Sequence, residues 1–123
     1  MTYDTGMLIA AEADARSAWV MHRQALRRGL LPVIPAAVLA QAWRGGPQPL
    51  LSRLLQGCVV EPIDESIARL AGRACARADT SDVVDAMVVV GALARGDLVV
   101  TSDVDDLARV ARAIGRRLAL HRI

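Results

Sequence analysis

The sequence of 123 residues contains no lysine and no phenylalanine, and aromatic residues make up only 2% of it. The 15 basic residues are therefore all arginine. The lack of lysine excludes P-loop NTPases, Schiff-base enzymes and phosphate-transfer folds that pair an aspartate with a lysine. The scarcity of aromatic side chains argues against nucleic-acid modules that stack bases on aromatic platforms. The core must be built from aliphatic side chains.

Cysteine and long apolar runs are also scarce. Cys58 and Cys75 have no C-x-x-C partner and no neighbouring histidine, so we expect small buried thiols in a reducing compartment. The N-terminus lacks the basic start of a signal peptide. The longest apolar stretch, residues 86–94, is far shorter than the roughly 20 residues that span a bilayer. We therefore expect a cytoplasmic protein that does not enter the membrane.

What is present is a hydrophobic content of 54%, without repeats, low-complexity tracts or a linker, which predicts one domain over residues 1–123. Short aliphatic runs predict strands at residues 2–4, 32–34, 58–61, 98–101 and 118–122. Longer segments rich in Ala, Leu and Arg predict helices at residues 5–13, 15–28, 35–44, 48–56, 64–78, 82–95 and 104–114. Apolar strands without alternation are typical of parallel sheets covered on both faces. The sequence therefore predicts a three-layer α/β/α domain, with the apolar helix at 82–95 against the centre of the sheet.

Acidic residues follow two of the predicted strands. Asp4 ends the first strand, Asp103 follows the fourth, and Asp82 and Asp85 share one face in the first turn of a helix. Taken singly, each acid is a favourable helix cap. Taken together, the acids meet at the carboxyl ends of the strands and repel one another unless a cation binds. Carboxylates without nearby histidine or cysteine suit Mg²⁺ or Mn²⁺.

The remaining charged side chains have two interpretations. His22 and His121 are isolated, so we expect ordinary core or surface residues rather than a Ser/His/Asp site. Arg16, Arg23 and Arg27, together with Arg28, run along one predicted helix. This stripe either contacts an RNA backbone or forms a solvated face, and we favour the solvated face.

Four segments, taken in order, resemble the PIN domain, and among PIN domains the VapC-like toxins of bacterial toxin–antitoxin pairs. They are YDTGMLIA (3–10), IPAAVLAQAWRGG (34–46), SDVVDAMVV (81–89) and VVTSDVDDL (99–107). The resemblance covers essentially the whole chain. It implies a PIN-like α/β/α fold with an about five-stranded parallel sheet. It also implies an endoribonuclease that uses Mg²⁺ or Mn²⁺ to activate a water for attack on RNA phosphodiester bonds.

The resemblance also carries over residue by residue. The catalytic and metal-binding acids fall on Asp4, Asp85 and Asp103. The family's other acid, usually a glutamate, falls on Gln41, which offers a carbonyl oxygen but no charge. Three aspartates suffice for one metal ion, whereas a two-metal site is not favoured. The supporting residues are Gln41, Asp82, Asp106, Thr5, Thr101 and Ser102, and Arg44 is the candidate for RNA binding. Glu12 is the nearest other acid.

The resemblance further implies an RNA substrate, a small cognate antitoxin and a homodimer, with apolar surface near Trp19 or Trp43 facing a partner. Two alternatives stay open. The chain is a PIN-like module that binds RNA or protein, in which Gln41 marks lost activity, or it is a metal-dependent nuclease with no toxin role. Metal-dependent cleavage separates the enzyme from the binding module.

Overall fold

The computed structural model describes all 123 residues, which alternate between short strands and helices. The strands are β1 (Thr2–Tyr3), β2 (Val33–Pro35), β3 (Val59–Glu61), β4 (Leu98–Thr101) and β5 (Ala119–Arg122). The helices are α1 (Thr5–Glu12), α2 (Arg16–Arg27), α3 (Ala36–Ala42), α4 (Pro49–Gln56), α5 (Glu65–Ala78), α6 (Val83–Arg95) and α7 (Val104–Ala113). Each predicted strand and helix is present, with ends shifted by a residue or two.

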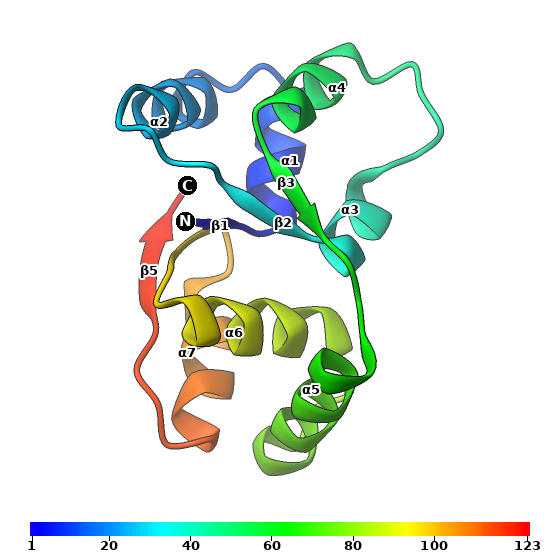
Figure 1. The fold of residues 1–123 in the computed structure, drawn as a ribbon, viewed down its shortest axis with the longest axis vertical. Helices are drawn as coiled ribbons and strands as arrows, with labels where there is room; N and C mark the ends of the chain where they lie inside the picture. The colour runs from blue at the N-terminus through cyan, green and yellow to red at the C-terminus, as the bar shows by residue number, and fades with distance from the viewer.

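The five strands form one sheet in the order β3-β2-β1-β4-β5, and every pair is parallel. Figure 1 shows α1, α2 and α4 on one side of this sheet and α5, α6 and α7 on the other. The predicted three-layer α/β/α arrangement is confirmed. The strand order reverses at β1, which lies between β2 and β4. Open sheets of this kind bind ligands beyond the carboxyl ends of the strands that flank such a reversal.

The core is aliphatic, as the composition requires. Leu8 and Ile34 are fully buried, and Tyr3 is the one fully buried aromatic side chain. Val88 and Val89 of α6 are also fully buried, and this helix contacts both β2 and β4. The prediction that the apolar helix packs against the centre of the sheet is confirmed. No helix in the structure is both long enough and apolar enough to cross a membrane.

Helix α3 is shorter than predicted. The sequence pattern extended it to residue 44, but it ends at Ala42 because Trp43 has extended backbone angles (φ −74°, ψ 132°). The glycine pair at residues 45–46 follows directly, and both glycines have positive φ. The consequence is that Trp43 and Arg44 lie on a loop rather than on the helix that carries Gln41.

A partly buried ionic network connects the sheet to the end of α6. Arg95 forms an ion pair with Glu61, and its Nε lies 3.0 Å from Asp97 Oδ2. The Thr2 hydroxyl donates to the same Asp97 oxygen at 2.7 Å. Burial alone would raise the pKa of Asp97, but hydrogen bonds from the Met1 amino group, Thr2 and Arg95 lower it overall. The ionised carboxylate of Asp97 therefore stabilises the fold.

We expect Asp97→Asn to lower the free energy of unfolding near neutral pH by about 1–3 kcal/mol, because hydrogen bonds to a charged group are lost. Since the folded pKa lies below the ordinary 3.8, this stabilisation is complete above pH 3.8 and disappears as pH falls through the lowered value. Urea denaturation over that range measures the difference. Asp105→Asn is the control, because the Asp105 side chain is 95% exposed. A deficit that persists unchanged in strong acid would contradict the ionic origin.

Candidate metal centre

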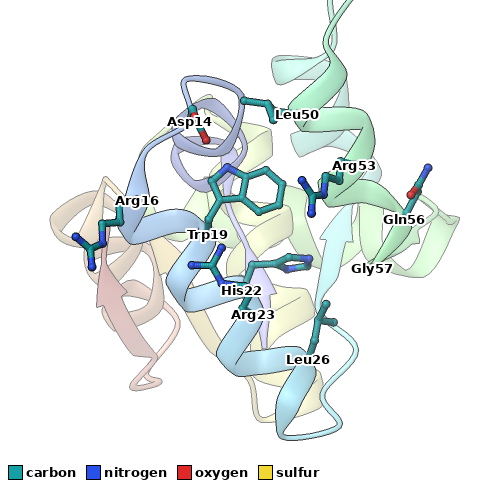
Figure 2. Close-up of a pocket in the computed structure, with 10 residues that line it drawn as sticks. All are labelled: Asp14, Arg16, Trp19, His22, Arg23, Leu26, Leu50, Arg53, Gln56 and Gly57. Atoms are coloured by element: carbon teal, nitrogen blue, oxygen red, sulfur yellow. The ribbon is translucent and has the colours of Figure 1, made fainter.

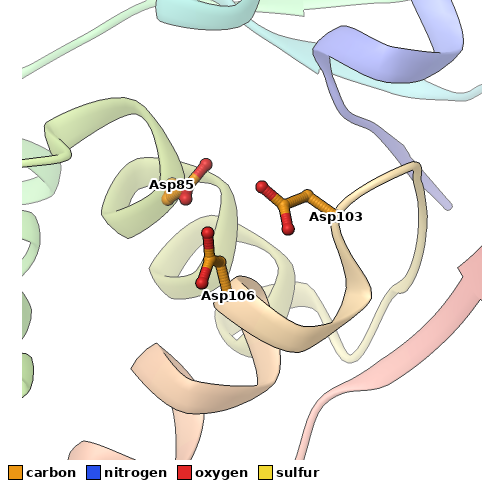
Figure 3. A group of neighbouring side chains, drawn as sticks. All are labelled: Asp85, Asp103 and Asp106. Atoms are coloured by element: carbon orange, nitrogen blue, oxygen red, sulfur yellow. The ribbon is translucent and has the colours of Figure 1, made fainter.

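Three aspartates from two helices meet at the carboxyl edge of the sheet. Asp103 lies between β4 and α7, Asp106 is in the first turn of α7, and Asp85 is in the first turn of α6. Each offers a carboxylate oxygen, and these oxygens all lie within 4.8 Å of one another. Figure 3 shows the three side chains pointing toward one another across the space between the two helices. The structure therefore brings together Asp85 and Asp103, as predicted, and adds Asp106 to the same cluster.

Asp4 is held beside this cluster by a threonine. The Thr101 hydroxyl donates to Asp4 Oδ2 at 2.7 Å and accepts from the Asp103 backbone N–H at 2.9 Å. Thr101 is fully buried and Asp4 is 5% exposed. A hydroxyl has one proton to donate, so the Asp4 carboxylate receives it and the Asp103 N–H must point at the oxygen. This bridge fixes the position of Asp4 relative to the turn that carries Asp103.

The close approach of α1 to that turn depends on Gly6. A Cβ at this position would lie 2.2 Å from Ser102 Oγ and 2.9 Å from the Ser102 backbone nitrogen. Only glycine avoids that overlap without moving the backbone. Ser102, predicted as a supporting residue, is therefore the packing partner that brings the start of α1, just after Asp4, against the Asp103 turn.

The capping alternative is right for one acid and wrong for another. Asp82 Oδ1 accepts from the Asp85 backbone N–H at 3.0 Å, so Asp82 caps α6. Asp103 occupies the corresponding position before α7, but its side chain makes no capping hydrogen bond. Asp82 therefore contributes structure and negative charge, whereas the Asp103 carboxylate faces Asp85 and Asp106.

Like charges in this cluster oppose ionisation. The pKa of Asp85 is raised to about 7, first by burial and then by the negative charges of Asp82, Asp4, Asp103 and Asp106. Burial raises the pKa of Asp103 as well, with further contributions from the Asp106 charge. A divalent cation removes this repulsion. Because the cluster offers carboxylate oxygens and no imidazole or thiol, its donor set fits Mg²⁺ or Mn²⁺.

Gln41 reaches the centre through Thr5. The Thr5 hydroxyl donates to Gln41 Oε1 at 2.6 Å, which ties α3 to the residue that follows Asp4. Gln41 and Arg44 also line a groove of about 400 Å³ between α1 and the α3–α4 connection. The Arg44 guanidinium donates to the Trp43 carbonyl at 2.8 Å. The structure thus links Gln41 to the residue next to Asp4 and puts Arg44 on the same groove as Gln41.

Two basic residues near the cluster were not predicted. Arg109 Nε lies 3.9 Å from Asp106 Oδ1, and Arg122 donates to the Ser102 carbonyl oxygen at 3.2 Å. The spacing of Asp106 and Arg109 along α7 was a usable signal, because residues three apart share a helix face. Nothing in the sequence brings Arg122 of β5 to the same turn. Glu12 is not part of the centre, because its carboxylate accepts from the Leu51 backbone N–H of α4 at 2.6 Å.

Comparison with known proteins finds a shared fold. No family model matches the chain, and no curated protein matches its sequence. Twelve chains of solved structures do match. One belongs to the crystal structure of VapBC2 from Rickettsia felis bound to a DNA fragment from their promoter. It has a TM-score of 0.75 and 15% identity, and the match covers 100% of this chain and 99% of that chain. At this identity the likeness shows the fold alone, and it agrees with the PIN-like architecture predicted from the sequence.

We expect the metal-free protein to lose stability as pH rises from 3.8 toward 7. In this range Asp85 is already ionised in the unfolded chain but still protonated in the folded state, so rising pH favours the unfolded chain. Asp85→Asn removes this loss. Above pH 7 in EDTA the variant should melt at least about 2 °C higher than the parent. Thermal melting followed by circular dichroism measures the difference.

Millimolar Mn²⁺ should reverse the order, because it stabilises the parent by binding and stabilises the variant less. Asp105→Asn serves as the matched control, since its exposed carboxylate lies outside the cluster. Equal stabilisation of parent and Asp85→Asn by Mn²⁺ would rule out Asp85 as a ligand.

Proposed function

We propose that this chain is a Mg²⁺- or Mn²⁺-dependent endoribonuclease, acting in the cytoplasm as the toxin of a type II toxin–antitoxin pair. The observation that carries the proposal is the convergence of the Asp85, Asp103 and Asp106 carboxylates within 4.8 Å, beside a buried Asp4. The shared fold with a chain of the VapBC2 structure supports the toxin assignment, as do the four sequence segments that resemble VapC-like proteins.

The residues proposed to hold the cation are Asp4, Asp85 and Asp103, with Asp106 completing the oxygen donors. When bound, the cation would polarise a non-bridging oxygen of the scissile phosphate and activate a water for in-line attack. Thr101 engages only Oδ2 of Asp4 and so leaves Oδ1 for a ligand. Asp82 keeps the first turn of α6 in place and thereby orients Asp85.

The arginines at the rim would contact the RNA backbone. Arg44 lies on the groove that begins at Gln41, and Arg122 is anchored on the Ser102 carbonyl beside the cluster. A guanidinium donates two parallel hydrogen bonds to a phosphate, so either side chain suits a phosphodiester. We propose Arg44 as an RNA contact outside the metal centre, on the groove that Gln41 also lines.

Gln41 supports the second candidate, a PIN-like binding module without catalysis. Its amide brings no charge where the resemblance expects a carboxylate, and its oxygen already accepts from Thr5. Asp4, Asp85 and Asp103, with Asp106 beside them, still provide enough carboxylate oxygens for one cation. We therefore favour the enzyme over the binding module.

The partner-facing apolar surface was predicted near Trp19 or Trp43, and the exposure of the two side chains favours Trp43. Trp19 is only 9% exposed and its indole N–H donates to the Ala11 carbonyl, so it belongs to the core. Trp43 is 40% exposed and lines a wholly apolar groove with Leu39 and Leu55. This surface supports a protein partner. The small antitoxin and the homodimer stay predictions.

Single-turnover RNA cleavage in Mg²⁺ tests the proposal. We expect Asp103→Asn to slow cleavage at least about 100-fold, because it removes a ligand charge while asparagine retains the shape. Asp106→Asn should have an intermediate effect. Its carboxylate lies in the cluster, but the resemblance to VapC-like proteins gives this aspartate only a supporting role.

Asp105→Asn is the matched control: its carboxylate is 95% exposed, lies outside the cluster and approaches only Arg122, at 3.7 Å, so the variant should cut at close to the parent rate. Circular dichroism confirms that each variant is folded, and EDTA should abolish cleavage in all of them. Parental cleavage by Asp103→Asn would overturn the assignment and favour the binding module.

We expect Gln41→Glu to tighten Mn²⁺ binding about tenfold, because the new carboxylate adds a charged oxygen donor and can still accept from Thr5. Isothermal titration calorimetry of parent and variant measures the change. Gln48→Glu, on the same groove, is the control for added charge. Equal gains in both variants would indicate long-range attraction rather than coordination at Gln41.

A further inference from the structure

A second polar cleft lies between α2 and α4 and contains none of the acids described above. Its volume is about 590 Å³, and only three of its ten lining residues are hydrophobic. Figure 2 shows Trp19, His22 and Arg53 turned toward this space, whereas Arg16 points away from it. The size is within the range of small-molecule binding sites.

A buried histidine forms the base of the cleft. His22 is 4% exposed, and its Nδ1 lies 3.1 Å from the Tyr3 hydroxyl oxygen. Nε2 makes no hydrogen bond within the protein. Every side-chain nitrogen or oxygen that is fully buried does have a hydrogen-bond partner, so Nε2 cannot be fully buried. Nε2 is therefore the atom through which His22 meets the cleft. A polar atom on an otherwise buried side chain, aimed into a cavity, is a ready ligand contact.

Gly57 keeps this nitrogen uncovered. A Cβ at Gly57 would lie 2.9 Å from His22 Nε2 and 3.0 Å from its Cε1. The backbone of Gly57 has φ −95°, which any residue can adopt, so the glycine is not required by the conformation. The lack of a side chain instead leaves the imidazole edge open.

The walls carry unpaired positive charge. Arg23 and Arg53 line the cleft, and neither forms an ion pair. The Arg53 guanidinium carbon lies 5.6 Å from the centroid of the Trp19 ring, a cation–π contact that holds it over the cleft. Asp14 is the only acid on the lining. Two guanidinium groups above a buried nitrogen favour an anion with several oxygens.

We propose that the cleft between α2 and α4 binds a phosphate group of a nucleotide, with His22 Nε2–H, Arg23 and Arg53 donating to the phosphate oxygens. The phosphate is carried by a free nucleotide or by an RNA chain, and the chemistry of the site is the same for both. The Tyr3 hydroxyl has no hydrogen-bond partner in the protein other than His22 Nδ1, 3.1 Å away. When this hydroxyl donates to Nδ1, the imidazole proton is on Nε2 and points to the cleft. The predicted arginine stripe is thus divided, because Arg23 lines the cleft and Arg27 does not.

The test uses Trp19 as a reporter. In a Trp43→Phe background Trp19 is the only tryptophan, so its fluorescence reports on the cleft. Titration in EDTA with inorganic phosphate, AMP and a short oligoribonucleotide should give a saturable change that chloride at equal ionic strength does not. Calorimetry of the same additions gives the affinity.

Arg23→Gln should weaken binding about tenfold or more, because a charge-assisted hydrogen bond is lost. Arg27→Gln, on the same helix but outside the cleft, should bind as the parent does. Gly57→Ala should weaken binding as well, because the methyl group covers Nε2, and circular dichroism checks that the variant is folded.

Binding of AMP that is sensitive to Arg23→Gln and tighter than that of inorganic phosphate identifies a free nucleotide as the source of the phosphate. Equal binding of AMP and inorganic phosphate, with no binding of the oligoribonucleotide, would overturn the assignment to a nucleotide. Binding of the oligoribonucleotide alone, with the same sensitivity, identifies an RNA chain. No binding, equal loss in Arg23→Gln and Arg27→Gln, or tighter binding of a polyglutamate peptide would overturn the proposal. The measurements need neither a metal nor cleavage, so their failure would leave the proposed nuclease untouched.

Discussion

The arrangement at the carboxyl edge of the sheet depends on the hydroxyl of one buried residue, Thr101. It accepts from the backbone of Asp103 and donates to the side chain of Asp4, two residues that follow the neighbouring strands β4 and β1. Without this bridge a buried carboxylate would lose its partner, which is costly in a low-dielectric interior. The same bridge fixes where α1 begins after β1 and where α7 begins after β4. Gly6 then allows α1 to close against the same turn.

Electrostatics divides the molecule into two regions of opposite sign. Negative charge is concentrated where α6 and α7 begin, and the positive ends of the two helix dipoles partly offset it. Positive charge without ion-pair partners lies along α2 and α4 instead. Because the basic groups are arginines, their charge does not vary across the physiological range. The surface of α2 and α4 therefore attracts an anionic polymer. The acidic surface where α6 and α7 begin repels such a polymer unless a bound cation neutralises the carboxylates.

The fold could be predicted almost completely, and the reason is periodicity. Aliphatic runs broken by glycine and proline located the five strands, and the rule for parallel sheets brought Asp4 and Asp103 to one edge. The finer geometry of the centre was not predictable. Asp106 lies one turn after Asp103, and both meet Asp85 because α6 packs against α7, a contact that the sequence does not encode. The sequence offered Trp19 and Trp43 as alternatives for the partner-facing surface, because nothing in it indicates that the Trp19 indole N–H donates to the Ala11 carbonyl.

His22 shows the same limit. A histidine in an arginine-rich helix looked ordinary, and its burial indeed places it in the core. Its two nitrogens nevertheless have different surroundings, because one faces Tyr3 and the other faces the space left by Gly57, which is 35 positions away in sequence. Such a difference arises only when distant segments pack, so no local pattern encodes it.

The placement of β1 at the centre of the sheet has a consequence for the order in which the chain is made. Strand β1, which Asp4 follows directly, is synthesised before most of the sheet, but it pairs with β4, through Thr2 with Val99 and Tyr3 with Val100. Pairing across such a long sequence separation is slow and must await the synthesis of the partner strand. A nascent chain that ends before β4 therefore has Asp4 but lacks Thr101 and Asp103. The acidic centre is assembled only when translation of this segment is nearly finished.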